Sequence, residues 1–207
     1  MRKILSFTFC LFIFILPSQT TYEYLLYNAS ANEFDVIGDE AYEKNNRNAQ
    51  DITTKLEPSI SSSSKAETIG SDNFEAKNLI DGNMKTCWLS ATDGKNETFE
   101  LIIDLEDNAS VSQAQVWDIY FFNGWRKDFH TWKEYSRIKK ASMSVNDMPY
   151  AEITFEDTYK LQSIDLDKFK IDKSRRCRIR FRISEVYPGA KFQQVAFSDV
   201  QLIGKTK

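Results

Sequence analysis

Two short stretches of the chain carry the residue types that could recognise a ligand. In the first, Asn123-Gly124 ends an apolar run and places Trp125 and Arg126 on a loop. An indole face on a loop can stack on the apolar C–H face of a pyranose, while nearby polar groups bind its hydroxyls. An alternative of equal weight is that Trp125 folds back and caps the core.

The second stretch is a turn. Tyr187-Pro188-Gly189 places Pro before Gly, as a type II turn requires, and Lys191 follows. Such turns lie at the surface, where side chains can reach a ligand, and a purely structural turn is the alternative that the pattern favours. The candidate ligand-binding residues are therefore Asn123, Trp125, Arg126, Tyr187 and Lys191.

Catalytic patterns are absent from the sequence. The chain has one histidine, His130, so no histidine-rich metal site can be built. It also lacks a Gly-x-Ser-x-Gly elbow, a phosphate loop and a dinucleotide fingerprint. We therefore expect a protein that is not an enzyme, has no catalytic residues and needs no cofactor.

The elements that must position the candidate residues are strands. Apolar and polar residues alternate in several runs separated by Gly, Asn, Asp and Pro, which predicts antiparallel strands with one buried face. A helical period is limited to residues 129–135. The prediction is an all-β sandwich or jelly roll. The alternating runs are 99–105, 117–121, 141–145, 151–155, 179–183 and 196–202.

One predicted strand carries three arginines on its polar face, Arg178, Arg180 and Arg182. They form either an anion-binding surface or a solvated face balanced by carboxylates on a neighbouring strand, and the second interpretation is favoured. The expected partners are Glu152, Glu156 and Asp157.

The N-terminus predicts export. Arg2 and Lys3 precede an apolar run over residues 4–16 that is too short to span a bilayer, so residues 1–20 are predicted to be a signal peptide. Residues 21–57 are a predicted flexible arm, in which 22–27 could form a short strand, and residues 58–207 form the domain. No later segment suits a membrane span. We expect a secreted, periplasmic or cell-surface protein.

Charge and cysteine content narrow the partners and the redox chemistry. The formal net charge of −3 becomes −5 when the signal peptide removes two basic residues, which argues against nucleic-acid binding. An oxidising compartment favours a disulfide between Cys87 and Cys177. Side-chain parity argues against it, because Cys177 shares the inward face of its strand while Cys87 points away from a buried Trp88. Two free thiols are favoured, and the disulfide remains the alternative.

Four ordered motifs carry a family resemblance. The chain resembles a discoidin domain (coagulation factor 5/8 type C), in the branch named for the translocation or glycan-binding domain of bacterial NAD glycohydrolases. The resemblance covers about residues 58–204. The motifs are Asn78-Leu79-Ile80-Asp81-Gly82-Asn83 with Thr86-Cys87-Trp88, Phe122-Asn123-Gly124-Trp125, Tyr135-Ser136-Arg137-Ile138-Lys139-Lys140, and Val186-Tyr187-Pro188-Gly189-Ala190-Lys191-Phe192 with Val195-Ala196-Phe197-Ser198-Asp199-Val200.

The resemblance implies a galactose-binding-like jelly roll that binds carbohydrate through loops at one end. It implies no catalysis, because the NAD-cleaving activity of the namesake toxins belongs to a separate domain. A glycan or a cell-surface glycoconjugate is the expected partner. The alternative is a protein-interaction or adhesin-like module that uses the same loops, with the arm 21–57 as a contact segment. Since some relatives bind calcium, a structural calcium ion could be held by Asp72, Asp81 and Asp199.

Overall fold

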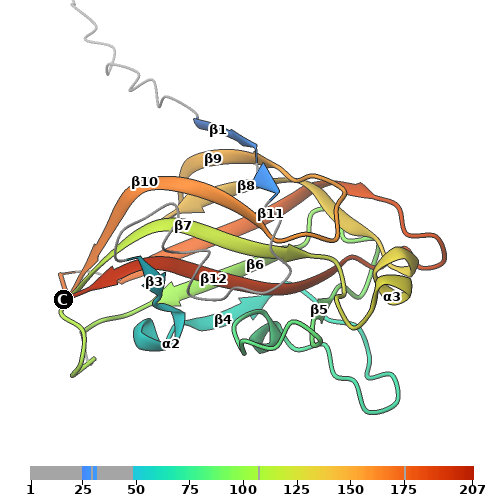
Figure 1. Ribbon diagram of the computed structural model, residues 1–207, viewed down its shortest axis with the longest axis horizontal. Helices are drawn as coiled ribbons and strands as arrows, with labels where there is room; N and C mark the ends of the chain where they lie inside the picture. The colour runs from blue at the N-terminus through green and yellow to red at the C-terminus, as the bar shows by residue number, and fades with distance from the viewer. Residues whose placement is uncertain (1–24, 29, 32–48, 107, 175) are drawn as a thin grey trace, which may run out of the picture.

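The computed structural model describes residues 25–28, 30–31, 49–106, 108–174 and 176–207, so the predicted signal peptide lies outside the described residues. Strands dominate this part of the chain, and its helices are short (Figure 1). The helices are α2 (Thr53–Leu56), the 3-10 helix η1 (Ala76–Leu79) and α3 (Phe129–Glu134). The strands are β1 (Leu25–Asn28), β2 (Ser30–Ala31), β3 (Gln50–Asp51), β4 (Ser59–Ser62), β5 (Trp88–Leu89), β6 (Thr98–Ile103), β7 (Gln113–Asn123), β8 (Arg137–Val145), β9 (Met148–Thr154), β10 (Gln162–Asp172), β11 (Cys177–Tyr187) and β12 (Ala196–Thr206).

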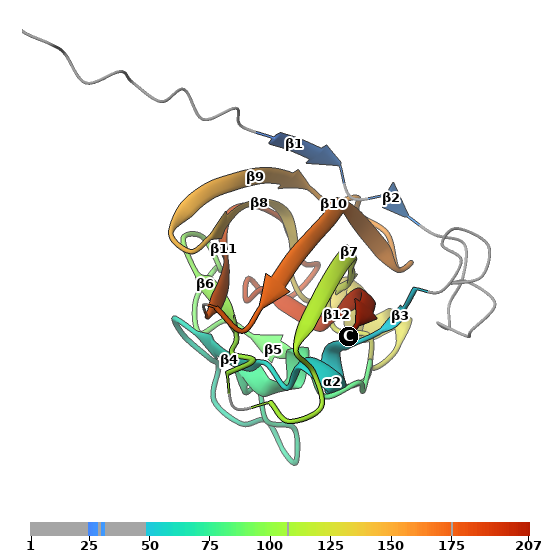
Figure 2. The same cartoon turned by 90° about the vertical axis from the view of Figure 1, so that its left-hand side faces the viewer.

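The described strands form two sheets that face each other. One sheet has the order β1-β9-β8-β11-β6-β4, and the other has the order β2-β10-β7-β12-β3, with β5 paired to β12. The pairs are antiparallel except that β1 runs parallel to β9. Figure 2 shows the two sheets from one end, curving around a shared interior. The predicted all-β sandwich is confirmed.

The core lies between the sheets, where alternate side chains meet. In β6, Phe99, Leu101 and Ile103 are buried and the residues between them are half-buried, which is the alternation predicted from the sequence. Phenylalanine rings fill the centre. Phe99 stacks on Phe181 with ring centroids 4.8 Å apart. The burial of these rings, together with their mutual packing, supplies much of the hydrophobic stabilisation of the fold.

The domain begins earlier than residue 58. Ile52 and Leu56 are buried in the main core, and the backbone N–H of Ile52 donates to the carbonyl oxygen of Leu202 at 2.9 Å. The Thr53 hydroxyl accepts a hydrogen bond from the backbone of Leu202 at 2.8 Å. Residues 49–57, which the sequence analysis assigns to the arm, are therefore a structural part of the domain.

Further towards the N-terminus, the arm supplies two edge strands. The expected short strand is present over Leu25–Asn28 as β1, which pairs with β9 at the edge of one sheet. Strand β2 pairs with β10 in the other sheet. The described parts of the arm are therefore paired with the domain.

Cys87 and Cys177, the two cysteines among the described residues, are buried, and no disulfide joins them. Cys177 lies in the main core with Trp88, as strand parity predicts. Cys87 lies in a different apolar cluster, next to Trp125 and Tyr135. The interpretation favoured by the sequence, that Cys87 and Cys177 are not joined by a disulfide, agrees with this arrangement.

Two of the three arginines on β11 are balanced by carboxylates. Arg180 lies 2.7 Å from Glu100 on β6, and both Arg178 and Arg180 lie 3.1 Å from Asp147 in the turn between β8 and β9. The solvated, ion-paired face is thus confirmed for these two. The predicted partners, Glu152, Glu156 and Asp157, are wrong. Glu152 lies in β9 and the other two follow that strand, and β9 pairs with β8 and not with β11.

Asp199 is a buried carboxylate on the face of β12 opposite the core residues Val200 and Leu202. It is 1% exposed, and one carboxylate oxygen accepts a hydrogen bond from the Gln201 amide at 2.8 Å. Among the described residues, the other oxygen has no hydrogen-bond partner. Burial, with smaller contributions from the charges of Asp51 and Asp81, raises the pKa of Asp199 to about 7.

The free energy of unfolding should therefore fall as the pH rises from about 4 to about 7. The unfolded chain releases this proton near pH 3.8 and the folded chain only near pH 7, so ionisation of Asp199 opposes folding across that window. Asp199→Asn mimics the protonated acid and should be more stable than the native chain at pH 8, by at most about 4 kcal/mol. Denaturant unfolding at pH 4.5 and pH 8 measures this, and a pH-independent difference would contradict it.

A second prediction tests the start of the domain. Leu56→Ala should lower the free energy of unfolding by about 2–5 kcal/mol, because truncating a buried leucine leaves a cavity. Lys55→Ala is the matched control at the exposed neighbouring position and should change it by less than about 0.5 kcal/mol. Urea unfolding at constant pH measures both variants. A loss of stability in Leu56→Ala as small as that in Lys55→Ala would show that residues 49–57 lie outside the cooperative unit.

Candidate functional site

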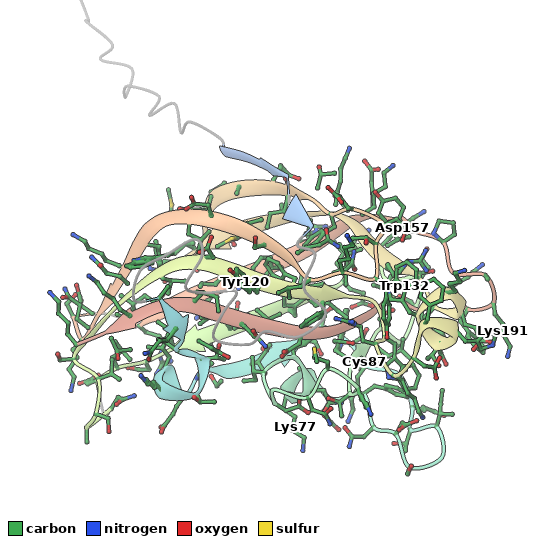
Figure 3. All side chains as sticks on the ribbon, in the orientation of Figure 1. Lys77, Cys87, Tyr120, Trp132, Asp157 and Lys191 are labelled. Carbon is green, nitrogen blue, oxygen red and sulfur yellow. The ribbon has the colours of Figure 1, made fainter. Side chains whose placement is uncertain are left out.

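Both stretches of candidate residues lie at one end of the sandwich. Helix α3 and the connection between β11 and β12 occupy the end opposite the C-terminus in Figure 1. The backbone N–H groups of Ala190 and Lys191 donate to the carbonyl oxygens of Lys133 and Glu134 at 2.9 and 3.1 Å. Figure 3 shows Trp132, Asp157 and Lys191 gathered at this end. The two stretches therefore lie side by side in the structure.

Asn123 joins the two sheets at this end. Its side-chain Nδ2 donates to the carbonyl oxygen of Ile138 at 2.7 Å, and the Ile138 backbone N–H donates back to Oδ1 at 2.9 Å. The side chain is 2% exposed, so a ligand cannot reach it. Asn123 ends β7 and Ile138 lies at the start of β8, so the amide links strands of opposite sheets.

Gly124 allows helix α3 to approach the end of β7. Its φ of +103° suits glycine, and a Cβ atom there would lie 2.4 Å from Cδ1 of Trp132. The Trp132 indole N–H donates to the carbonyl oxygen of Asn123 at 2.7 Å. The Ser198 hydroxyl donates to the carbonyl oxygen of Gly124 at 2.7 Å and accepts from the backbone of Arg126 at 3.0 Å. Hydrogen bonds to the backbone thus hold the loop at Asn123, Gly124 and Arg126.

Trp125 is buried, with 5% of its surface exposed. Its indole N–H donates to the carbonyl oxygen of Lys85 at 2.9 Å, and its ring packs edge-on against Phe74 and Tyr135, each at 5.2 Å between centroids. Of the two possibilities left by the sequence, the structure shows the one in which Trp125 folds back over the core. The indole face is therefore closed to a sugar in this structure.

The other candidate residues are accessible to different degrees. The Arg126 guanidinium is buried between the rings of Phe122 and Tyr159, 4.4 and 4.3 Å from their centroids. Tyr187 is half-buried, and its hydroxyl donates to the carbonyl oxygen of Phe155 at 3.0 Å. Lys191 is exposed, with its ammonium group 3.4 Å from Glu134. Lys191 is therefore the predicted residue best placed for ligand contact.

The structure adds an aromatic surface that the sequence analysis does not identify. We call Phe129, Trp132 and Tyr159 the aromatic patch. Phe129 is 51% exposed and stacks on Trp132, with centroids 5.7 Å apart and planes 10° from parallel. Tyr159 meets both rings edge-on, and the Lys133 ammonium lies 4.4 Å from the Phe129 centroid. An exposed ring beside a lysine can bind the C–H face of a sugar.

A local signal in the sequence marks this surface. The Asp128 side chain accepts a hydrogen bond from the backbone of Thr131 at 2.7 Å and so caps α3. Because Asp128 fixes the start of the helix, Phe129 occupies its first turn. That hydrogen bond also holds the pKa of Asp128 below its usual range.

Arg137 supports the aromatic patch from its buried side. It is buried and forms an ion pair with Asp157 at 2.6 Å. Its guanidinium also donates to the carbonyl oxygen of Tyr135 at 2.7 Å and lies 4.5 Å from the Trp132 ring centroid. The indole of Trp132 is therefore held between this arginine and Phe129.

The proposed calcium ligands do not fit a shared ion. The Asp72 carboxylate forms an ion pair with Lys127 at 2.7 Å, Asp81 accepts from the Thr86 hydroxyl at 2.8 Å, and Asp199 is buried beside Gln201. Within the described ranges, no group of three or more His, Cys, Asp or Glu side chains is arranged to hold a metal ion. None of the helices in the same described ranges has the length and apolar composition needed to cross a bilayer.

The fold and this end of the molecule define a class of protein, the galactose-binding-like β-sandwich of F5/8 type C. Residues 39–203 match the family described as the NAD glycohydrolase translocation F5/8 type C domain, and the chain belongs to that family. The resemblance carried by the four motifs is thereby confirmed. None of the curated proteins matches the chain.

Solved structures share the fold at low sequence identity, so their likeness shows the fold alone. The CBM32-1 and CBM32-2 domains of Clostridium perfringens ZmpB, in complex with GalNAc, give a TM-score of 0.60 at 10% identity, covering 90% of this chain and 42% of that one. CpGH89CBM32-5 from the same organism, in complex with GalNAc-β-1,3-galactose, gives 0.50 at 13%, covering 72% and 96%. A putative chitobiase fragment from Bacteroides thetaiotaomicron gives 0.53 at 18%, covering 79% and 96%.

The burial of Trp125 leads to a stability prediction. Trp125→Ala should lower the free energy of unfolding by about 3–5 kcal/mol, because the indole fills a packed cluster and satisfies the Lys85 carbonyl. Ile69→Ala removes an apolar side chain that is 52% exposed and should have little effect. Thermal and urea unfolding measure the difference. A Trp125→Ala chain of unchanged stability that has lost sugar binding would show that the indole contacts the ligand after all.

Proposed function

We propose that this chain is a non-catalytic carbohydrate-binding domain, exported to the cell surface or beyond, that holds a sugar at the aromatic patch. The observation that carries the proposal is the exposure of Phe129, which is 51% accessible although it lies on a helix packed against the domain. A rigid exposed ring can bind an apolar sugar face with little loss of conformational entropy.

The neighbourhood of Phe129 suits a polyhydroxylated ligand. Lys133 forms no ion pair with any described residue, so its ammonium group can donate to hydroxyl or carboxylate oxygens. His130 and Lys191 both lie near Glu134, at 3.3 and 3.4 Å. One donor therefore lies beside the exposed ring, and further donors and an acceptor lie on the same helix or next to it, which suits the chemistry of a sugar site.

The comparisons favour the same ligand class. Two of the structures with this fold hold GalNAc or GalNAc-β-1,3-galactose, which makes these sugars the first to test here. The adhesin-like alternative, with the arm as the contact segment, is less favoured because β1 and β2 are paired with strands of the domain itself.

Phe129→Ala should weaken the binding of such a sugar about tenfold, equivalent to about 1.4 kcal/mol, without lowering the melting temperature. Met148→Ala is the matched control, because Met148 is 42% exposed and follows the turn at the far end of β8. A glycan array followed by calorimetric titration with GalNAc and GalNAc-β-1,3-galactose measures the effect.

Two outcomes would count against the proposal. One is the absence of binding to any arrayed glycan and to both sugars at millimolar concentration. The other is equal loss of affinity in Phe129→Ala and Met148→Ala, which would place the sugar somewhere other than the aromatic patch.

A further inference from the structure

A polar groove of about 510 Å³ crosses the outer face of the sheet that contains β4, β6 and β11. Strand register places Ser61, Glu100 and Arg180 in one row across the three strands. The groove lies on the face of this sheet, and the aromatic patch does not line it. Its lining consists of three consecutive serines (residues 61–63), Asn96, Thr98, Glu100, Arg180 and Arg182.

The arginines along this face differ in their partners. Arg178 and Arg180 share the carboxylates of Glu100 and Asp147. Arg182, two residues further along the same strand, donates through Nη2 to the amide oxygen of Asn96 at 3.0 Å and forms no ion pair with a described residue. Its positive charge therefore has a neutral partner, in contrast to the other two.

Asn96 is held in place independently of Arg182. Its backbone N–H donates to the carbonyl oxygen of Ile183 at 2.9 Å, and its φ of +65° is one that asparagine tolerates. Because its amide oxygen accepts from Arg182, its amide nitrogen is the group left to donate. The guanidinium is thus oriented by a fixed acceptor.

The carboxylates near the groove already have partners. Glu100 is bound by Arg178 and Arg180, and Glu97 accepts hydrogen bonds from the hydroxyls of Ser63 and Thr92. An anion that enters beside Arg182 would therefore meet Glu100 with its charge offset by two arginines, and Glu97 with its oxygens already bound by hydroxyl donors. The guanidinium of Arg182 and the amide of Asn96 are donors of the kind that bind planar or tetrahedral oxyanions. The hydroxyls of Ser62 and Ser63 already donate to the Ser64 carbonyl and to Glu97.

We propose that Arg182 anchors an oxyanion, as a sulfate, phosphate or carboxylate group of a ligand seated in this groove. The site is separate from the aromatic patch and does not depend on the proposed sugar binding there. It would let the domain distinguish a charged glycan or phosphorylated molecule from a neutral one.

The experiment uses the full mature chain and three probes: a sulfated tetrasaccharide, an oligogalacturonate of the same length, and inorganic phosphate. Affinity is measured by calorimetry at low and at moderate salt. We expect at least one probe to bind, and its affinity to fall at higher salt because the contact is ionic. The probe that binds best identifies the kind of oxyanion. Absence of binding by all three probes would overturn the proposal.

Arg182→Ala and Arg178→Ala form a matched pair, because both remove one positive charge from β11. Arg182→Ala should weaken binding at least tenfold, whereas Arg178→Ala should change it less than twofold. Equal losses would show a net-charge effect and would overturn the proposal.

Asn96→Asp tests the same site with the arginine retained. Aspartate tolerates the backbone conformation of Asn96 and would give Arg182 an anionic partner. The variant should therefore also lose at least tenfold in affinity. Unchanged affinity in Asn96→Asp would overturn the proposal even if Arg182→Ala proved too unstable to measure.

Discussion

The side-chain amide of Asn123 makes the interaction on which the end of the sandwich that carries α3 depends. It donates to and accepts from the backbone of the same residue, Ile138, and both partners are buried. If either bond were lost, a buried backbone group would remain without a partner, at a cost of about 1–3 kcal/mol. The amide holds together two strands that follow each other in the chain but lie in opposite sheets. The segment between these strands is the one that carries α3.

The loop that follows Asn123 sets the positions of Trp132 and Phe129 in the aromatic patch. Gly124 lets the indole of Trp132 lie against the chain, and Trp132 in turn supports Phe129. Arg137 lies on one side of the indole and pairs with Asp157 in the connection between β9 and β10. The exposed ring thus rests on a base built from both sheets. Asn123, Gly124 and Trp125 are buried parts of this base. The residue that faces the solvent is Phe129, four positions after Trp125.

The sequence predicts local features of this fold well and long-range ones poorly. Alternation in residues 99–103 and 179–183 identifies two strands, because the period of a strand is a property of the strand alone. It does not show that Glu100 and Asp147, and not Glu152, balance the arginines, because that depends on strand order. Residues 50–56 are too short to display a period, so their place in the core is visible only in the structure.

The candidate site shows the same limit. The Asn-Gly turn shows that Trp125 follows the end of a strand, but the exposure of its indole depends on partners such as Phe74 and Tyr135. Those contacts join loops that are distant in sequence. By contrast, the cap formed by Asp128 is local, and attention to it would have placed Phe129 in the first turn of a helix.

The separation of Cys87 and Cys177 determines the redox conditions under which this domain can fold. Cys87 and Cys177 are both buried but lie in different apolar clusters. Burial raises the pKa of Cys87 well above its usual range, so little reactive thiolate forms. No disulfide joins Cys87 to Cys177, so the packing of the described domain requires neither an oxidant nor a disulfide isomerase to pair them. The same native packing is accessible in a reducing cytosol and in an oxidising exterior.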